Sequence, residues 1–136
     1  MAPSEKDRAS YLPENFQPLQ EAGILKTLAG PAEIFPGISA WLSDGHTIGQ
    51  QLIKIADDSQ TLIYCADIIP MVSHLKLPYI MGYDLQPLVT LEEKRQILTQ
   101  AAEQGWILVF EHDPEIAAAT IQASDKGFMV KESLKL

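Results

Sequence analysis

The sequence predicts an α/β (α+β) fold with a mixed or antiparallel sheet and flanking helices. One amphipathic segment, residues 90–105, is followed at once by the apolar run 106–110, so a helix leads directly into a buried strand. Two further stretches, 51–65 and 117–132, each contain two short apolar runs around a polar turn, which is typical of β-hairpins. Together these patterns give a strand–helix–strand unit extended by antiparallel strands.

The first 23 residues are expected to form a helical cap segment rather than part of the core. Pro3 opens a polar piece that runs through Ser10, and Pro13 starts a second helical piece that Gly23 ends. No repeat or linker interrupts the sequence, so residues 1–136 are expected to form one domain. After the cap, short extended runs separated by Gly and Pro predict strands at 24–28, 33–35 and 38–42.

The predicted helix begins at Thr90, because Thr90 and Glu93 have the spacing of a capping box. Gly105 supplies the C-terminal stop. The stretch before it, Pro70–Leu88, mixes prolines and a glycine with large apolar residues, so it is expected to be a long ordered loop. Such loops in compact domains usually form pocket walls or lids.

Composition and charge exclude several functions. The chain has 136 residues, 18 of them acidic and 10 basic, and a net charge of −8. An acidic chain without a Lys/Arg cluster repels phosphate backbones, which argues against nucleic-acid binding. Apolar runs of about five residues are far short of the ~18 needed to span a membrane. The absence of a secretory signal at the start and the single Cys65 favour a cytoplasmic location.

Three predicted strands lead into a residue that binds metals or moves protons. His46 follows the strand at 38–42, Asp67 follows 61–65, and His112 follows 106–110. Because strand ends in layered α/β folds converge on a common mouth, these side chains could meet there and hold a divalent metal. In the alternative interpretation, Asp67 caps a turn, His46 lies in a surface turn, and His112 is a hydrogen-bonded histidine at a strand edge.

The proline-rich loop contains the third histidine, His74. With Tyr79, Met81 and Tyr83 it could line a mostly apolar substrate pocket, or it could be a partly exposed loop histidine. Cys65 ends an apolar strand and is expected to be buried filler rather than a nucleophile. The sequence has neither a Gly-rich phosphate loop nor a nucleophile elbow, which excludes the common nucleotide-binding and serine-hydrolase routes.

Four segments together resemble the metallo-β-lactamase-fold hydrolases: 45–51 (GHTIGQQ), 65–67 (CAD), 73–84 and 110–114 (FEHDP). They occur in the family's order, and the resemblance covers almost the entire chain. The closest branch contains quorum-quenching lactonases and methyl-parathion-hydrolase-like enzymes. In the first segment the family often has Gly-His-Thr-Pro-Gly-His, where this chain has Ile48 and Gln50.

The resemblance implies a dinuclear site, usually of two zinc ions, at one edge of an αββα sandwich. In that site His46 would bind the first metal, Asp67 would bridge both as the catalytic carboxylate, and His112 would bind the second. A metal-activated water would attack a small-molecule lactone, ester or phosphotriester. The resemblance places His74, Tyr79, Met81 and Tyr83 in the pocket wall.

One motif of that family is absent. The signature His-x-His-x-Asp-His of the first half of the fold does not occur, and the chain has three histidines in all. The chain is therefore expected to match the C-terminal half, as a fragment, a truncated frame or a natural half-domain, and to hold one zinc weakly or none. Homodimer formation through the exposed sheet face is expected. The alternative functions are a non-catalytic binding or assembly module and a small acidic interaction domain.

Overall fold

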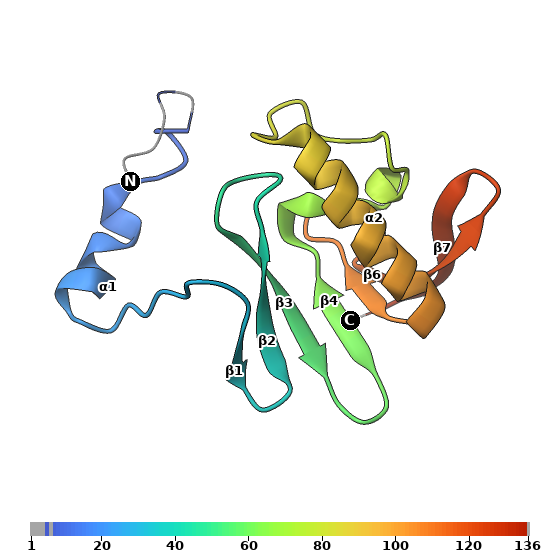
Figure 1. Cartoon of the computed structure of the whole chain (residues 1–136), viewed down its shortest axis with the longest axis horizontal. Coiled ribbons are helices and arrows are strands. Elements are labelled where there is room, and N and C mark those ends of the chain that lie inside the picture. The colour runs from blue at the N-terminus through green and yellow to red at the C-terminus, as the bar shows by residue number, and fades with distance from the viewer. Residues whose placement is uncertain (1–4, 6, 136) are drawn as a thin grey trace.

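Seven strands form a single sheet in the computed structural model, which describes residue 5 and residues 7–135 (Figure 1). The strands lie in the sheet in the order of the sequence, from β1 to β7. Because β4 and β5 are parallel and all other neighbours are antiparallel, the predicted mixed sheet is confirmed. The strands are β1 (Ala32–Phe35), β2 (Ile38–Ser43), β3 (Gln50–Ala56), β4 (Thr61–Tyr64), β5 (Ile107–Val109), β6 (Ala118–Ser124) and β7 (Gly127–Leu134).

Both predicted hairpins are confirmed. The first consists of β3 and β4, and Asp57 closes its turn because one carboxylate oxygen accepts hydrogen bonds from the backbone N–H groups of Ser59 and Gln60. The second consists of β6 and β7, which pair from Ser124 and Gly127 beside the turn to Ala118 and Leu134. The predicted strand–helix–strand unit is the parallel pair β4 and β5 with a helix between them.

That helix, α2 (Pro87–Gln104), lies across one face of the sheet (Figure 1). Its apolar side is buried, with Ile97, Leu98 and Ala101 each at most 5% exposed in the same core as Ile63 of β4 and Leu108 of β5. The helix ends at a glycine in the left-handed conformation, which glycine adopts without a steric penalty. The predicted stop is therefore confirmed.

The predicted start of this helix is wrong by three residues. The helix begins at Pro87, a residue favoured in the first turn, where its missing N–H costs no hydrogen bond. Thr90 and Glu93 do not cap it, because both side chains bond to other segments. Thr90 donates its hydroxyl to Asp84, and Glu93 accepts hydrogen bonds from the β2–β3 loop. Tertiary contacts have replaced the local capping box.

The strand predicted at 24–28 is also wrong. These residues form an extended connection without strand pairing between α1 (Gln17–Glu21) and β1, and Ile24 is 65% exposed. The pattern failed because a strand needs a neighbouring backbone to pair with, and none of the strands of the described sheet pairs with this segment.

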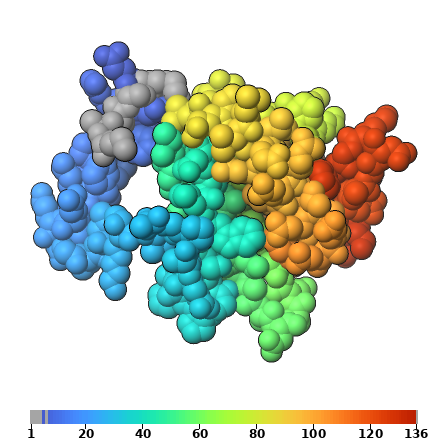
Figure 2. All heavy atoms as spheres, viewed as in Figure 1, coloured from blue at the N-terminus to red at the C-terminus, as the bar shows by residue number. Residues whose placement is uncertain are grey.

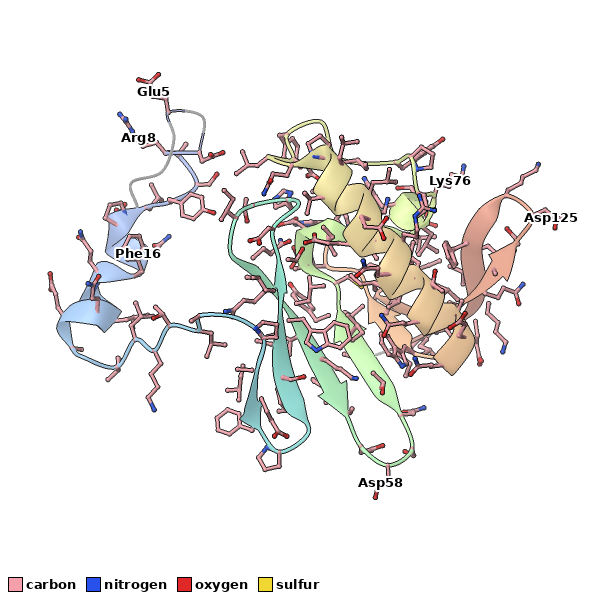
Figure 3. All side chains as sticks on the ribbon, in the orientation of Figure 1. Glu5, Arg8, Phe16, Asp58, Lys76 and Asp125 are labelled. Atoms are coloured by element: carbon pink, nitrogen blue, oxygen red, sulfur yellow. The ribbon has the colours of Figure 1, made fainter. Side chains whose placement is uncertain are left out.

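The predicted cap is partly helical. It contains the 3₁₀-helix η1 (Pro13–Asn15) and the short helix α1. After α1 the chain turns at Gly23, which has φ +67°. Neither helix buries a side chain, and Figure 3 shows Phe16 well away from the sheet. The predicted opening at Pro3 falls among residues 1–4, which with residue 6 lie outside the described part of the chain.

The loop between β4 and α2 is ordered, as expected, and carries the short 3₁₀-helices η2 (Ala66–Ile68) and η3 (Val72–Leu75). Lys94 of α2 has no exposed surface, and its ammonium donates hydrogen bonds to the carbonyls of Lys76, Leu77 and Tyr79 at 3.1, 3.3 and 2.6 Å. Because three carbonyls of the loop accept hydrogen bonds from one ammonium, Lys94 fixes the loop on the helix.

Many of the large exposed apolar side chains lie in the N-terminal segment and the first three strands. Figure 2 shows the segment before β1, in blue, standing to one side of the remainder. None of the described helices is both long and apolar enough to cross a membrane. Within these segments the exposed large apolar side chains are Tyr11, Leu12, Phe16, Leu19, Ile24, Leu25, Leu28, Ile34, Phe35, Leu42 and Ile55.

Candidate metal centre

The carboxyl ends of β2, β4 and β5 lie at the same edge of the sheet. β2 and β4 are each antiparallel to β3, which lies between them, and β4 is parallel to β5, so these three strands share one direction. His46 lies in the loop after β2, Asp67 in η2 directly after β4, and His112 shortly after β5. The topology therefore carries all three predicted residues to one edge.

The three side chains meet on the two oxygens of one carboxylate. His46 Nε2 lies 3.5 Å from Asp67 Oδ2, and His112 Nε2 lies 3.1 Å from Asp67 Oδ1. Asp67 is thus flanked by an imidazole nitrogen on each side. One carboxylate with a histidine at each oxygen is a donor set that suits a divalent ion.

Glu111 joins this cluster and was missed by the sequence reasoning. Its Oε1 lies 3.3 Å from His112 Nε2, and ligand atoms of Asp67, Glu111 and His112 all lie within 4.8 Å of one another. For bond lengths of about 2.05 Å, two ligands of a tetrahedral zinc ion lie roughly 3.3 Å apart. The donor set and its separations therefore fit a borderline divalent ion. Glu111 directly precedes the predicted ligand His112, and this adjacency is the signal that could have found it.

His46 is held from behind by the segment that precedes α2. Its Nδ1 lies 2.8 Å from Asp84 Oδ1, and its backbone carbonyl accepts a hydrogen bond from the N–H of Leu85 at 3.0 Å. The ring of Tyr83 meets the imidazole edge to face, with centroids 5.9 Å apart. The side chain of His46 is only 11% exposed, so it is held in one place between the loop and α2.

The β2–β3 loop is anchored to α2 by Glu93. The Glu93 carboxylate accepts hydrogen bonds from Ser43 Oγ at 2.8 Å and from the N–H groups of Asp44 and Gly45 at 2.9 and 3.2 Å. Sequence reasoning assigned Glu93 to the helix cap instead. A charged acceptor with three donors holds the chain immediately before His46.

Asp67 is presented by a strained turn. Ala66 has φ +44°, and among the described residues no other non-glycine residue has a positive φ. Such strain costs about 1–3 kcal/mol and persists where surrounding packing enforces it. The neighbouring Cys65 is fully buried and donates its N–H to the carbonyl of Val109, so the chain is fixed immediately before Ala66. Burial raises the pKa of the Cys65 thiol to about 12, which fits the predicted filler role.

A cleft of about 470 Å³ opens beside His46 and Asp67. This volume lies within the usual range for small-molecule sites. The N-terminal segment, which the sequence predicted to be a lid or cap, supplies part of its wall. The lining residues are Asp7, Ser10, Tyr11, His46, Thr47, Asp67 and Tyr83.

Of the predicted pocket residues, Tyr83 is among those that line this cleft, whereas His74, Tyr79 and Met81 are not. Tyr79 packs instead under the ammonium of Lys76, 4.9 Å from the ring centroid. His74 lies on η3, where burial and the nearby charge of Lys94 hold its pKa below the usual value, against the opposing effect of Asp84.

No family model matches the sequence, and no curated protein matches it. Several solved structures do match. A β-lactamase-superfamily hydrolase, AbOPH, superimposes with a TM-score of 0.79 over 97% of this chain at 18% identity. AidC, a dizinc quorum-quenching lactonase crystallised with a product, gives 0.76 over 98% at 19% identity. A probable metal-dependent hydrolase from Staphylococcus aureus gives 0.70 over 84% at 24% identity.

The chain has the fold of the metallo-β-lactamase superfamily. It spans less than half the length of these structures, 48% of AbOPH, 46% of AidC and 42% of the Staphylococcus aureus protein. The part it matches is C-terminal, as the motifs predicted. These structural neighbours are metal-dependent hydrolases, and the residues gathered at the sheet edge have the chemistry of metal ligands.

Proposed function

We propose that this chain supplies the C-terminal half of a metal-dependent hydrolase site, with His46, Asp67 and His112 as its metal ligands. The observation that carries the proposal is the meeting of both imidazole Nε2 atoms on opposite oxygens of Asp67, at 3.5 and 3.1 Å. The three residues lie 21 or more positions apart in the sequence, and each follows a different strand. Zinc is the proposed ion, because imidazole and carboxylate ligands suit it.

Each ligand has its own task in this proposal. His46 would bind the first ion and His112 the second, while Asp67 would bridge them through its two oxygens. A divalent cation, when bound, supplies Lewis-acid activation of a water and of the substrate oxygen. Glu111 lies 3.3 Å from His112 Nε2, the nitrogen proposed to bind the ion, and would help to hold that same ion.

The cleft beside the ligands is the proposed substrate site. Tyr11 and Tyr83 give it apolar walls, while Asp7, Ser10 and Thr47 give it polar ones. A lactone, ester or phosphotriester has both an apolar body and polar oxygens, which is the composition such a cleft accommodates. The lactonase among the structural neighbours supports this substrate class.

Hydrolysis is proposed only for the chain together with a second half. The sequence has three histidines and no His-x-His-x-Asp-His, so four or five histidine ligands cannot come from these 136 residues. The exposed apolar side chains of the N-terminal segment, β1, β2 and β3 form the proposed contact surface, either for that half or for a second copy of the chain. We place this assembly in the cytoplasm, where the buried thiol of Cys65 would stay reduced.

Metal binding by the purified chain tests the proposal. Calorimetric titration of the metal-free chain with Zn²⁺ should show about one bound ion. The substitution Asp67→Ala should abolish this binding. Asp58→Ala is the matched control, because it removes the same charge from the hairpin turn at the opposite end of β4 (Figure 3). Equal zinc binding by wild type and Asp67→Ala would refute the ligand assignment.

A non-catalytic binding or assembly module is the second candidate. It is favoured by the number of ligands, because a site with two histidines and two carboxylates lacks most of those that a dinuclear centre needs. A wild-type chain that binds no zinc but forms a stable dimer in scattering measurements would favour this function over hydrolysis.

A further inference from the structure

The side chain of Asp84 stands between the candidate ligand His46 and helix α2. It is 1% exposed, and each of its oxygens has a different partner. Oδ1 lies 2.8 Å from His46 Nδ1, and Oδ2 accepts the hydroxyl hydrogen of Thr90 at 2.7 Å. A buried carboxylate with both oxygens engaged has one available orientation.

This contact decides which nitrogen of His46 carries the proton. An ionised carboxylate only accepts hydrogen bonds, so the Nδ1 that faces Asp84 must be the protonated nitrogen. In a neutral imidazole the other nitrogen then has a free lone pair. That nitrogen is Nε2, which lies 3.5 Å from Asp67 Oδ2, too far for a normal hydrogen bond, so the 2.8 Å contact with Asp84 decides the tautomer.

The position of the loop depends on other bonds. The N–H groups of Leu85 and Gln86 donate to the carbonyls of His46 and Gly45 at 3.0 and 2.9 Å. The carboxylate of Glu93 accepts hydrogen bonds from the N–H groups of Asp44 and Gly45. These bonds are independent of the Asp84 side chain. Its separate contribution is therefore the rotation and tautomer of the imidazole ring.

We infer that Asp84 is a positioning residue that fixes His46 as its Nδ1–H tautomer and turns the Nε2 lone pair toward Asp67. The tautomer follows from contacts within the described chain, whereas its use in binding a metal rests on the proposed function. The environment of the His112 ring differs from that of His46. The side chain of His112 is 59% exposed, and its Nε2 faces the carboxylates of Asp67 and Glu111.

Nitrogen-15 NMR of the histidine side chains in the metal-free chain tests the inference directly. At pH 8, wild-type His46 should give one protonated Nδ1 and one unprotonated Nε2. In Asp84→Ala the ring should revert to the Nε2–H form that dominates in free histidine, or to a mixture. Wild-type His46 protonated at Nε2, or a signature that Asp84→Ala leaves unchanged, would overturn the inference.

Further variants separate orientation from folding. Asp84→Asn keeps the shape of the side chain but places an amide that can donate to Nδ1, so it should lose the Nδ1–H signature. Thr90→Val should keep that signature because Asp84 Oδ1 remains. Asp57→Ala removes a hydrogen-bonded carboxylate from the distant β3–β4 turn and should leave His46 unchanged. If Asp84→Ala fails to fold, the wild-type and Asp84→Asn spectra still decide the question: a mixed tautomer in wild type contradicts the inference.

Zinc titration distinguishes this inference from the proposed function. If both hold, Asp84→Ala should bind zinc roughly 10–100-fold more weakly than wild type, as is typical when the partner of a histidine ligand is lost. If wild type binds no zinc while the Nδ1–H tautomer is present, the proposed function fails and the role of Asp84 stands. Undiminished zinc affinity in a folded Asp84→Ala variant would contradict its positioning role.

Discussion

Gly45 packs against Thr90 so closely that no side chain fits between them. A Cβ built on Gly45 would lie 2.5 Å from Thr90 Oγ1 and 2.6 Å from both its backbone N and its Cα. Two of these three atoms belong to the backbone of α2, which cannot rotate away. This contact brings the β2–β3 loop onto the helix one residue before His46, so the position of the candidate ligand depends on the absence of a side chain.

Gly45→Ala is expected to destabilise the chain and move His46. Overpacking of one methyl group against backbone costs about 1–3 kcal/mol in the free energy of unfolding, which urea denaturation measures. Gly30→Ala is the control, since a Cβ on Gly30 meets no atom within 4 Å. Unchanged stability in Gly45→Ala would contradict the close contact.

Glu93→Ala is expected to loosen the same loop. Three donors, Ser43 Oγ and two backbone N–H groups, would lose a charged acceptor, at a cost of about 1.5–3 kcal/mol after partial replacement by water. Glu92→Ala is the matched control on the same helix. Its side chain is 60% exposed and faces Arg95 at 3.5 Å, so its loss should change unfolding by less than about 1 kcal/mol. Equal effects of the two substitutions would argue against the anchor.

Lys94 is expected to make stability depend on pH in the alkaline range. Burial lowers its pKa from 10.5 to about 8, against the opposing effect of Asp84, so the unfolded chain binds more protons between these two pH values. The contribution of Lys94 to the free energy of unfolding therefore rises as pH increases from 8 to 10.5.

Lys94→Met isolates this effect. The difference in unfolding free energy between wild type and Lys94→Met should grow by about 1–3 kcal/mol across that window, in urea denaturation at matched pH values. Lys126→Met, at an exposed turn, controls for the general titration of lysines. A constant difference would mean that Lys94 keeps an ordinary pKa in the folded chain.

Cys65 is expected to be unreactive until the chain unfolds. Its thiol is fully buried and its pKa is raised from 9.0 to about 12, which lowers the thiolate fraction at pH 8 by roughly 10³-fold. Labelling by a disulfide reagent should therefore be at least that much slower in buffer than in urea, with Cys65→Ser as the blank. Comparable rates in the two conditions would show that β4 is accessible in the native state.

The fold could be predicted largely from the sequence because its signals are local. Alternating apolar runs around Asp57 and Gly127 gave both hairpins, and Gly105 gave the end of α2. The start of α2 could not be predicted, because Thr90 and Glu93 have the spacing of a cap but bond to Asp84 and to the β2–β3 loop. Residues 24–28 have the composition of a strand but no strand beside them.

The sequence by itself determined the fold class and placed His46, Asp67 and His112 after three strands that end at one edge, because strand direction follows from the order of hairpins and helix. Only the tertiary structure decided what surrounds them. Glu111 joins the cluster, Asp84 faces the back of His46, and Glu93 holds its loop. The contacts of Asp84 and Glu93 join residues 38 and 50 positions apart, so no local pattern records them.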